Sequence, residues 1–183
     1  MTLAKPFTPA SYQDVIDAPP NKVAEILAGE LHLSPRPASR HARAHSRLGM
    51  DIEPFDSDPS GWVILYEPEL HLGRDVLVPD LAGWRRERMP EIPDTVGFTL
   101  APDWVCEIAS PSTRRIDRLL KLPIYRREDV PWVWLVDPVA ESVEVLKGLD
   151  TRWVIEATAI GAGAVRLPPF DAIELDPGRW FAR

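Results

Sequence analysis

Three residues in the middle of the chain are of the types that bind a metal ion and act on a phosphate group. Asp80 follows Pro79 in an apolar stretch, Glu107 interrupts the apolar segment 104–109, and Lys121 follows in a helical pattern. A buried carboxylate is costly unless it is paired or binds a metal. Two acids on neighbouring strands suit Mg²⁺ (or Mn²⁺), which would polarise a phosphate and help to generate hydroxide. Lys121 could then stabilise charge on the phosphoryl oxygens.

Each of these residues also has an ordinary structural interpretation. Aspartate commonly follows proline in turns, a strand glutamate can be an edge or ion-pair residue, and a helical lysine is usually solvated. Asp117 precedes Lys121 by one helical turn, so the two either share a role at the site or form a simple ion pair. The hypothesis therefore depends on the combination and its order.

The apolar pattern predicts an α/β or α+β protein with helices packed on a central mixed sheet. A strand, a helix and a strand within 104–136 predict a parallel crossover. The helix of this crossover contains Pro123, which predicts a kink or a weakened turn. Helices are predicted at 19–28, 39–52 and 112–128, and strands at 30–34, 62–72, 76–84, 104–109, 132–136, 142–147 and 152–159.

Composition is typical of one globular domain that spans residues 1–183, with 45% hydrophobic and 27% charged residues. The single cysteine, Cys106, and an N-terminal stretch without the features of a secretory signal predict a cytoplasmic protein. No apolar run is long enough to span a membrane. A net charge of −7 argues against a protein that coats nucleic acid but allows a local contact with it.

Motifs between residues 78 and 138 resemble the bacterial family of predicted restriction endonucleases within the PD-(D/E)XK phosphodiesterase superfamily. The motifs are Val-Pro-Asp-Leu at 78–81, Trp-Val-Cys-Glu-Ile-Ala-Ser-Pro-Ser-Thr at 104–113, Asp117, Lys121, Tyr125, and Val-Pro-Trp-Val-Trp-Leu-Val-Asp-Pro at 130–138. Weaker similarity extends to 29–31, His41 and Phe181.

The resemblance implies a restriction-endonuclease-like fold and hydrolysis of DNA with Mg²⁺ or Mn²⁺ held by Asp80 and Glu107. The superfamily pattern would place lysine at position 109, which is Ala109 in this chain. The family pattern has Lys121 as the replacement, and we expect Asp117 to position it. Glu30 lies at a position that the resemblance indicates as a third metal ligand; alternatively it is a surface strand residue.

Several nearby polar residues are further candidates. Ser110, Ser112 and Arg114 precede or begin the predicted helix at 112–128, where backbone N–H groups favour phosphate. Glu67 and Glu69 are two positions apart in a predicted strand, so both point to the same face and one of them could reach the metal. His41 and His45 have a spacing that can chelate zinc, but no third ligand is placed to complete a zinc site.

Two groups of arginines could bind phosphates or form solvated helix faces. For the first group the solvated interpretation is favoured, whereas Arg114 gains support from its place at the start of a helix. The two groups are Arg36, Arg40, Arg43 and Arg47, and Arg114, Arg115 and Arg118.

Three functions remain open at this point. The first is a Mg²⁺-dependent DNA endonuclease, and because such enzymes often cut both strands as dimers, a homodimer is a further hypothesis. The second is a catalytically inactive restriction-endonuclease-like domain that binds nucleic acid or protein. The third is a metal-dependent hydrolase of another phosphoester, such as RNA or a nucleotide.

Overall fold

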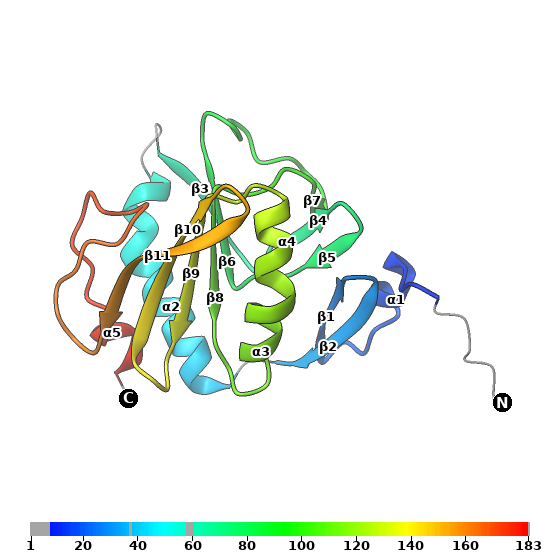
Figure 1. The fold of residues 1–183 in the computed structure, drawn as a ribbon, viewed down its shortest axis with the longest axis horizontal. Coiled ribbons are helices and arrows are strands. Elements are labelled where there is room, and N and C mark those ends of the chain that lie inside the picture. Colours follow the sequence, from blue (N-terminus) through cyan, green and yellow to red (C-terminus); the bar gives the residue numbers. More distant parts are fainter. Residues whose placement is uncertain (1–7, 37, 58–60, 183) are drawn as a thin grey trace.

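A computed structural model describes residues 8–36, 38–57 and 61–182, which form two β-sheets and the helices that cover them (Figure 1). The larger sheet has six strands, of which β8 and β9 are parallel and all other neighbours antiparallel. In spatial order it consists of β11 (Arg152–Ile160), β10 (Ser142–Leu149), β9 (Trp132–Asp137), β8 (Trp104–Ile108), β6 (Leu81–Arg85) and β3 (Trp62–Tyr66).

The smaller sheet has five short strands and includes the β1–β2 hairpin, which lies to one side of the larger sheet (Figure 1). Its strands, in spatial order, are β2 (Glu30–Pro35), β1 (Lys22–Leu27), β5 (Asp75–Leu77), β4 (Glu69–Leu72) and β7 (Gly97–Phe98). The helices are α1 (Tyr12–Ile16), α2 (Ser39–Ser57), α3 (Arg114–Ile116), the π-helix η1 (Asp117–Lys121), α4 (Leu122–Arg127) and α5 (Gly178–Phe181).

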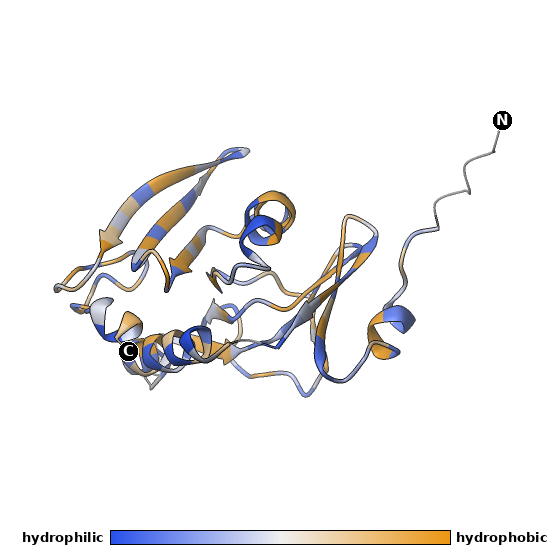
Figure 2. Cartoon of the chain, turned by 90° about the horizontal axis from the view of Figure 1, so that it is seen from below, coloured by the Kyte–Doolittle hydropathy of each residue, from blue (hydrophilic) through white to orange (hydrophobic). Residues whose placement is uncertain are grey.

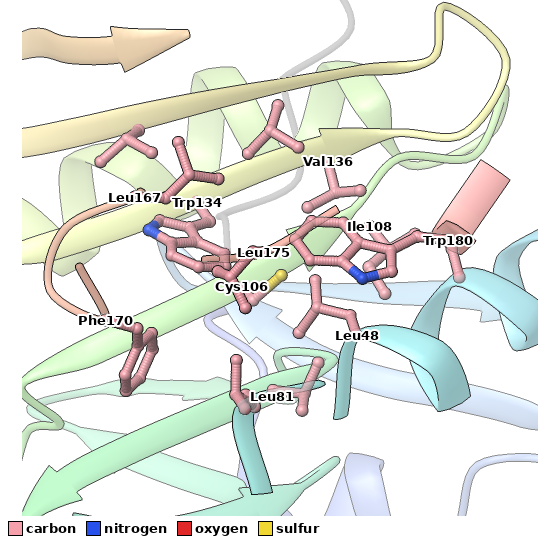
Figure 3. Packing of buried hydrophobic residues seen from close by; sticks show 14 of the residues in the cluster. Leu48, Leu81, Cys106, Ile108, Trp134, Val136, Leu167, Phe170, Leu175 and Trp180 are labelled. Carbon is pink, nitrogen blue, oxygen red and sulfur yellow. The ribbon is translucent and has the colours of Figure 1, made fainter. Parts of the chain in front are cut away.

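Side chains of β8 alternate between two cores because successive residues of a strand point to opposite faces. Cys106 and Ile108 share one core with Leu48 of α2, and Figure 3 shows these three residues in the same cluster. Val105 belongs to the other core, together with Tyr125 of α4. The helix α2 and the segment α3–η1–α4 therefore cover opposite faces of the larger sheet, and Glu107 shares the face of Val105.

The pattern of hydropathy agrees with this layered arrangement. In Figure 2 hydrophilic and hydrophobic residues alternate along the strands and mix around the helices. Elements with such alternation, for example β10, bury one face, whereas β8 at the centre of the larger sheet is buried along its whole length. Among the described residues, no helix is long and apolar enough to cross a membrane.

The predicted helix at 19–28 was wrong, because this segment forms β1 and a hairpin turn. Residues 24–27 are buried, so the segment lacks the alternation that would have indicated a strand. Gly29, interpreted as a helix stop, instead follows Ala28 in the turn. Both residues have positive φ (53° and 83°), as a two-residue type I′ hairpin requires.

The other predicted elements are found with changes at their ends. The helix at 39–52 extends to residue 57, and the strands at 104–109, 132–136, 142–147 and 152–159 correspond to β8, β9, β10 and β11. The predicted strands 62–72 and 76–84 are each broken in two. The second half of each joins a different sheet from the first, so the strands form two sheets instead of the one central sheet that was predicted.

Candidate active site

Asp80 and Glu107 lie opposite each other at the ends of two adjacent strands. Leu81 of β6 pairs with Cys106 of β8 in an antiparallel ladder. Continuing this register by one residue places Asp80 opposite Glu107, and opposite residues of a pair point to the same face. Both line a pocket of about 330 Å³, together with Asp117 and Lys121.

Lys121 is the buried cation of this pocket and has three carboxylate partners. Its ammonium nitrogen Nζ lies 2.9 Å from Oε1 of Glu25, 3.2 Å from Oε2 of Glu107 and 3.7 Å from Oδ1 of Asp117. The side chains of all four residues are at most 5% exposed. Position 109 of the strand is alanine, and Lys121 reaches Glu107 from the adjacent helix at hydrogen-bonding distance.

A π-turn places Asp117 and Lys121. The N–H of Leu122 bonds to the carbonyl of Asp117, five residues earlier, instead of four as in an α-helix. Pro123 follows at the start of α4 and has no N–H to donate to the carbonyl of residue 119. The weakened turn that was predicted at Pro123 therefore lies immediately before this proline. This widened turn carries two of the candidate residues, Asp117 and Lys121.

Glu107 is held by two donors. The hydroxyl of Tyr125 donates to Oε1 at 2.5 Å, and Lys121 contacts Oε2. Tyr125 is fully buried on α4, one helical turn beyond Lys121. Its position in the family-like motif was noted in the sequence, but its contact with Glu107 could not be inferred there.

Asp80 is fixed by helix α2 and by the neighbouring strand. Its Oδ1 lies 2.9 Å from Nε2 of His41, and its Oδ2 accepts the backbone N–H of Ile108 at 2.6 Å. His45, one turn further along α2, contacts the backbone carbonyl of Asp80 at 2.9 Å. The same carbonyl accepts the N–H of Glu67, which has a positive φ of 47°. His41 thus contacts the carboxylate of Asp80, and His45 contacts its backbone.

The pocket is rich in negative charge, and burial changes how its groups ionise. Burial, followed by the nearby carboxylates, raises the pKa of Glu107 well above its usual value, although Lys121 opposes this effect. Burial likewise raises the pKa of Asp117 to about 6. For Lys121, burial alone would lower the pKa, but Glu107, Glu25 and Asp117 together raise it well above its usual value. One ammonium therefore faces more carboxylates than it can neutralise.

This donor set fits a hard divalent cation better than zinc. Asp80 and Glu107 supply carboxylate oxygens side by side, and excess negative charge around them favours a cation. In the part of the chain that the structure describes, no group of three or more His, Cys, Asp or Glu side chains is arranged to hold a metal ion. Mg²⁺ needs only one or two carboxylates because it retains several waters, whereas structural zinc is enclosed by four ligands.

Glu30, the third carboxylate expected from the sequence, lies outside the pocket. It is exposed at the start of β2, next to the hairpin turn. Glu25 of β1 lies in the pocket instead, is 3% exposed, and also accepts the N–H of Val78 at 2.8 Å. The proposed set of metal ligands is corrected accordingly, since Glu30 does not line the pocket that contains Asp80. Glu25 was missed because β1 was predicted as a helix.

The remaining candidates divide between the pocket and its surroundings. Glu67 lines the pocket, whereas Glu69 contacts Tyr12 and His71 elsewhere, because the strand predicted to carry both is broken between them. Ser110 and Ser112 line the pocket, and their hydroxyls lie 2.9 Å apart.

Arg114 does not line the same pocket. Its guanidinium forms an ion pair with Asp137 at 2.5 Å, and the two line a neighbouring hollow of about 180 Å³. Glu107 and Asp117 line both hollows, so Arg114 lies close to the site but on another side of it. A phosphate-binding role for Arg114 would first require this ion pair to open.

Comparisons with known proteins identify the family and the fold of the chain. The model of a family described as "Putative restriction endonuclease", Uma2, matches residues 9–176. A similar solved structure is that of a putative nuclease of the DUF820 group from Anabaena variabilis. It has a TM-score of 0.75 and 21% identity, and the match covers 95% of this chain and 98% of that one. No curated protein matches the chain.

Proposed function

This chain belongs to the Uma2 family, which is of the restriction-endonuclease-like type, and from that premise we propose that it is a Mg²⁺- or Mn²⁺-dependent endonuclease that hydrolyses DNA. The observation that supports the proposal most strongly is the position of Asp80 and Glu107 side by side in one pocket with Lys121. Two carboxylates can hold a divalent cation, and an ammonium group can stabilise the charge that develops on phosphoryl oxygens.

Asp80 and Glu107 would hold the metal. Bound there, the metal would supply a Lewis acid for the phosphate and lower the pKa of a water molecule. The histidine and backbone contacts of Asp80 keep its carboxylate facing the pocket. Tyr125 and Lys121 do the same for Glu107. Such supporting contacts fix ligand orientation and strengthen metal binding.

Lys121 would act on the phosphate or on the attacking water. Its pKa is raised by the surrounding carboxylates despite burial, so it stays an ammonium at neutral pH. A fixed positive charge in a site with little water stabilises the negative charge that develops on phosphoryl oxygens. Asp117 and Glu25 hold the ammonium from two other sides, and we assign to both a positioning role.

The proposal is tested by cleavage of supercoiled plasmid, single-stranded DNA and single-stranded RNA with Mg²⁺ or Mn²⁺. We expect nicking of the plasmid by the wild type and its loss in Lys121→Met. The matched control is Lys147→Met, which removes a lysine that lies over the ring of Trp132 outside the pocket. Cleavage of RNA alone would favour a metal-dependent hydrolase of another phosphoester. No cleavage of any substrate would favour a catalytically inactive domain that binds nucleic acid or protein.

A further inference from the structure

Four arginines lie at or along one side of α2. Arg40, Arg43 and Arg47 follow one another at spacings of three and four residues, so they share one face of the helix. Arg40 and Arg43 are exposed, and Arg47 is half-buried. The seven residue steps from Arg40 to Arg47 span about 10 Å of helix, on the order of three nucleotide steps of one DNA strand. No acid occurs between Glu30 and Asp51.

Arg40, Arg43 and Arg47 are available, in contrast to two members of the second basic group, whereas Arg36 donates to the backbone carbonyl of Pro20 at 3.2 Å. Within residues 8–36, 38–57 and 61–182, no ion pair or side-chain hydrogen bond joins Arg40, Arg43 or Arg47 to another residue. Arg114 and Arg118 are instead paired with Asp137 and Glu144, respectively. The sequence favoured Arg114 as a phosphate contact, whereas the structure leaves the arginines of α2 unpaired.

The arginine face begins at the pocket. Arg36 lines the pocket itself, and Arg40 and Arg43 line a hollow of about 370 Å³ between α2 and the C-terminal residues Trp180 and Phe181. A positive track therefore runs from the pocket mouth along the outside of α2. A hollow between two arginine side chains gives a phosphate group two donors on one helix.

Another face of the same helix contacts Asp80, the candidate metal ligand. His41 and His45 point toward Asp80, while Ala44 and Leu48 pack in the core. The arginine face and the histidine face thus belong to one rigid element. A nucleic acid lying on the arginines would be fixed relative to Asp80 with no mobile segment between them.

We propose that the arginine face of α2, formed by Arg40, Arg43 and Arg47, together with Arg36 just before the helix, binds the phosphate backbone of duplex DNA and leads it to the pocket. The choice of DNA rests on the proposed function. The assignment of the surface as a phosphate-binding one rests instead on its charge, its exposure and its continuity with the pocket. The contacts would be made to phosphates and would carry no sequence preference. The overall charge of −7 makes such a local positive track the natural place for an anionic polymer.

The test measures binding without cleavage. Fluorescence anisotropy of an end-labelled duplex of about 30 base pairs is followed in EDTA over a range of salt concentrations. The double variant Arg40→Gln/Arg43→Gln is compared with Arg74→Gln/Arg152→Gln, which removes the same charge from two exposed arginines that do not line the pocket. Loss of two phosphate contacts should weaken binding about tenfold or more and make the slope of log K against log salt shallower by about 2.

The outcomes separate this proposal from the proposed nuclease activity. A large effect in the α2 variant and a change below about twofold in the control support the binding surface, even if no substrate is cleaved in Mg²⁺. Equal effects in the two variants, an unchanged salt slope, or no binding of the duplex by the wild type would overturn it, even if cleavage is observed. We expect both variants to fold, because all four side chains are at the surface. Circular dichroism checks that they do.

Discussion

The ammonium group of Lys121 lies 2.9 Å from Oε1 of Glu25, a contact that joins β1 of the smaller sheet to the helix that follows β8 of the larger sheet. The same oxygen accepts the N–H of Val78, two residues before Asp80. Glu25 thus connects the lysine with the chain segment that carries one of the candidate metal ligands. Its position suggests that the β1–β2 hairpin is required for the geometry of the site.

Replacing Glu25 by Gln should therefore lower activity without abolishing metal binding. The neutral amide cannot hold the ammonium of Lys121 as tightly, so we expect kcat to fall about 10- to 100-fold with little change in KM. Glu30→Gln is the matched control, because Glu30 is exposed and outside the pocket. An equal loss of activity in both variants would contradict the role assigned to Glu25.

Tyr125→Phe removes the hydroxyl that donates to Glu107. The Oε1 oxygen of this buried carboxylate would lose a donor, which should lower the free energy of unfolding by about 1–3 kcal/mol. Urea denaturation measures the change, and Tyr66→Phe serves as a control because Tyr66 is 53% exposed. If both substitutions leave stability unchanged, the hydroxyl of Tyr125 does not support Glu107.

His41→Leu should weaken metal binding, because Asp80 would lose the imidazole that contacts its Oδ1. Loss of a group that orients a metal ligand typically reduces affinity about 10- to 100-fold. Titration calorimetry with Mn²⁺ measures this, and His41→Gln, which retains an N–H donor, should recover part of the affinity. His71→Leu is a control away from the pocket. Wild-type affinity in His41→Leu would show that Asp80 needs no such support.

Asp117→Asn should stabilise the metal-free protein at neutral pH. Burial raises the pKa of Asp117 from 3.8 to about 6, so the folded state binds its proton more tightly than the unfolded state. The contribution of this group to stability is present below pH 3.8 and is lost as the pH rises through 6. At pH 7.5 the charged carboxylate is therefore unfavourable, by on the order of 1–3 kcal/mol.

The measurement for Asp117 is the melting temperature in EDTA as a function of pH. We expect the variant to exceed the wild type at pH 7.5 and the difference to vanish near pH 4. A lower melting temperature for Asp117→Asn across the whole range would mean that the ion pair with Lys121 outweighs burial.

Much of the site could be predicted from the sequence because its residues lie in motifs with clear local structure. Glu107 interrupts an apolar strand, and Lys121 follows in a helical segment, so a strand–helix unit brings them together. Glu25 could not be predicted, because its strand is buried on both faces and resembles an apolar helix. The contacts of Tyr125 and His41 depend on packing between elements distant in the sequence, for which no local pattern exists.

The fold class was predicted correctly, but the division of the strands into two sheets was not. Elements with a consistent period, such as α2 and the β10–β11 hairpin, were found in the sequence. The breaks after Tyr66 and Leu77 depend on turns that send the chain into another sheet, and an apolar run does not reveal them. The backbone at Glu67, with its positive φ, is one such turn, and it lies in the pocket.

The central claim is that Asp80 and Glu107 bind a divalent cation, and calorimetric titration of Mg²⁺ and Mn²⁺ tests it most directly. The wild type is compared with Asp80→Asn, whose amide oxygen can still accept the N–H of Ile108, and with Glu30→Gln. We predict saturable binding by the wild type and by Glu30→Gln, and at least tenfold weaker binding by Asp80→Asn. Equal binding by all three proteins, or none by the wild type, would contradict the assignment of the metal site.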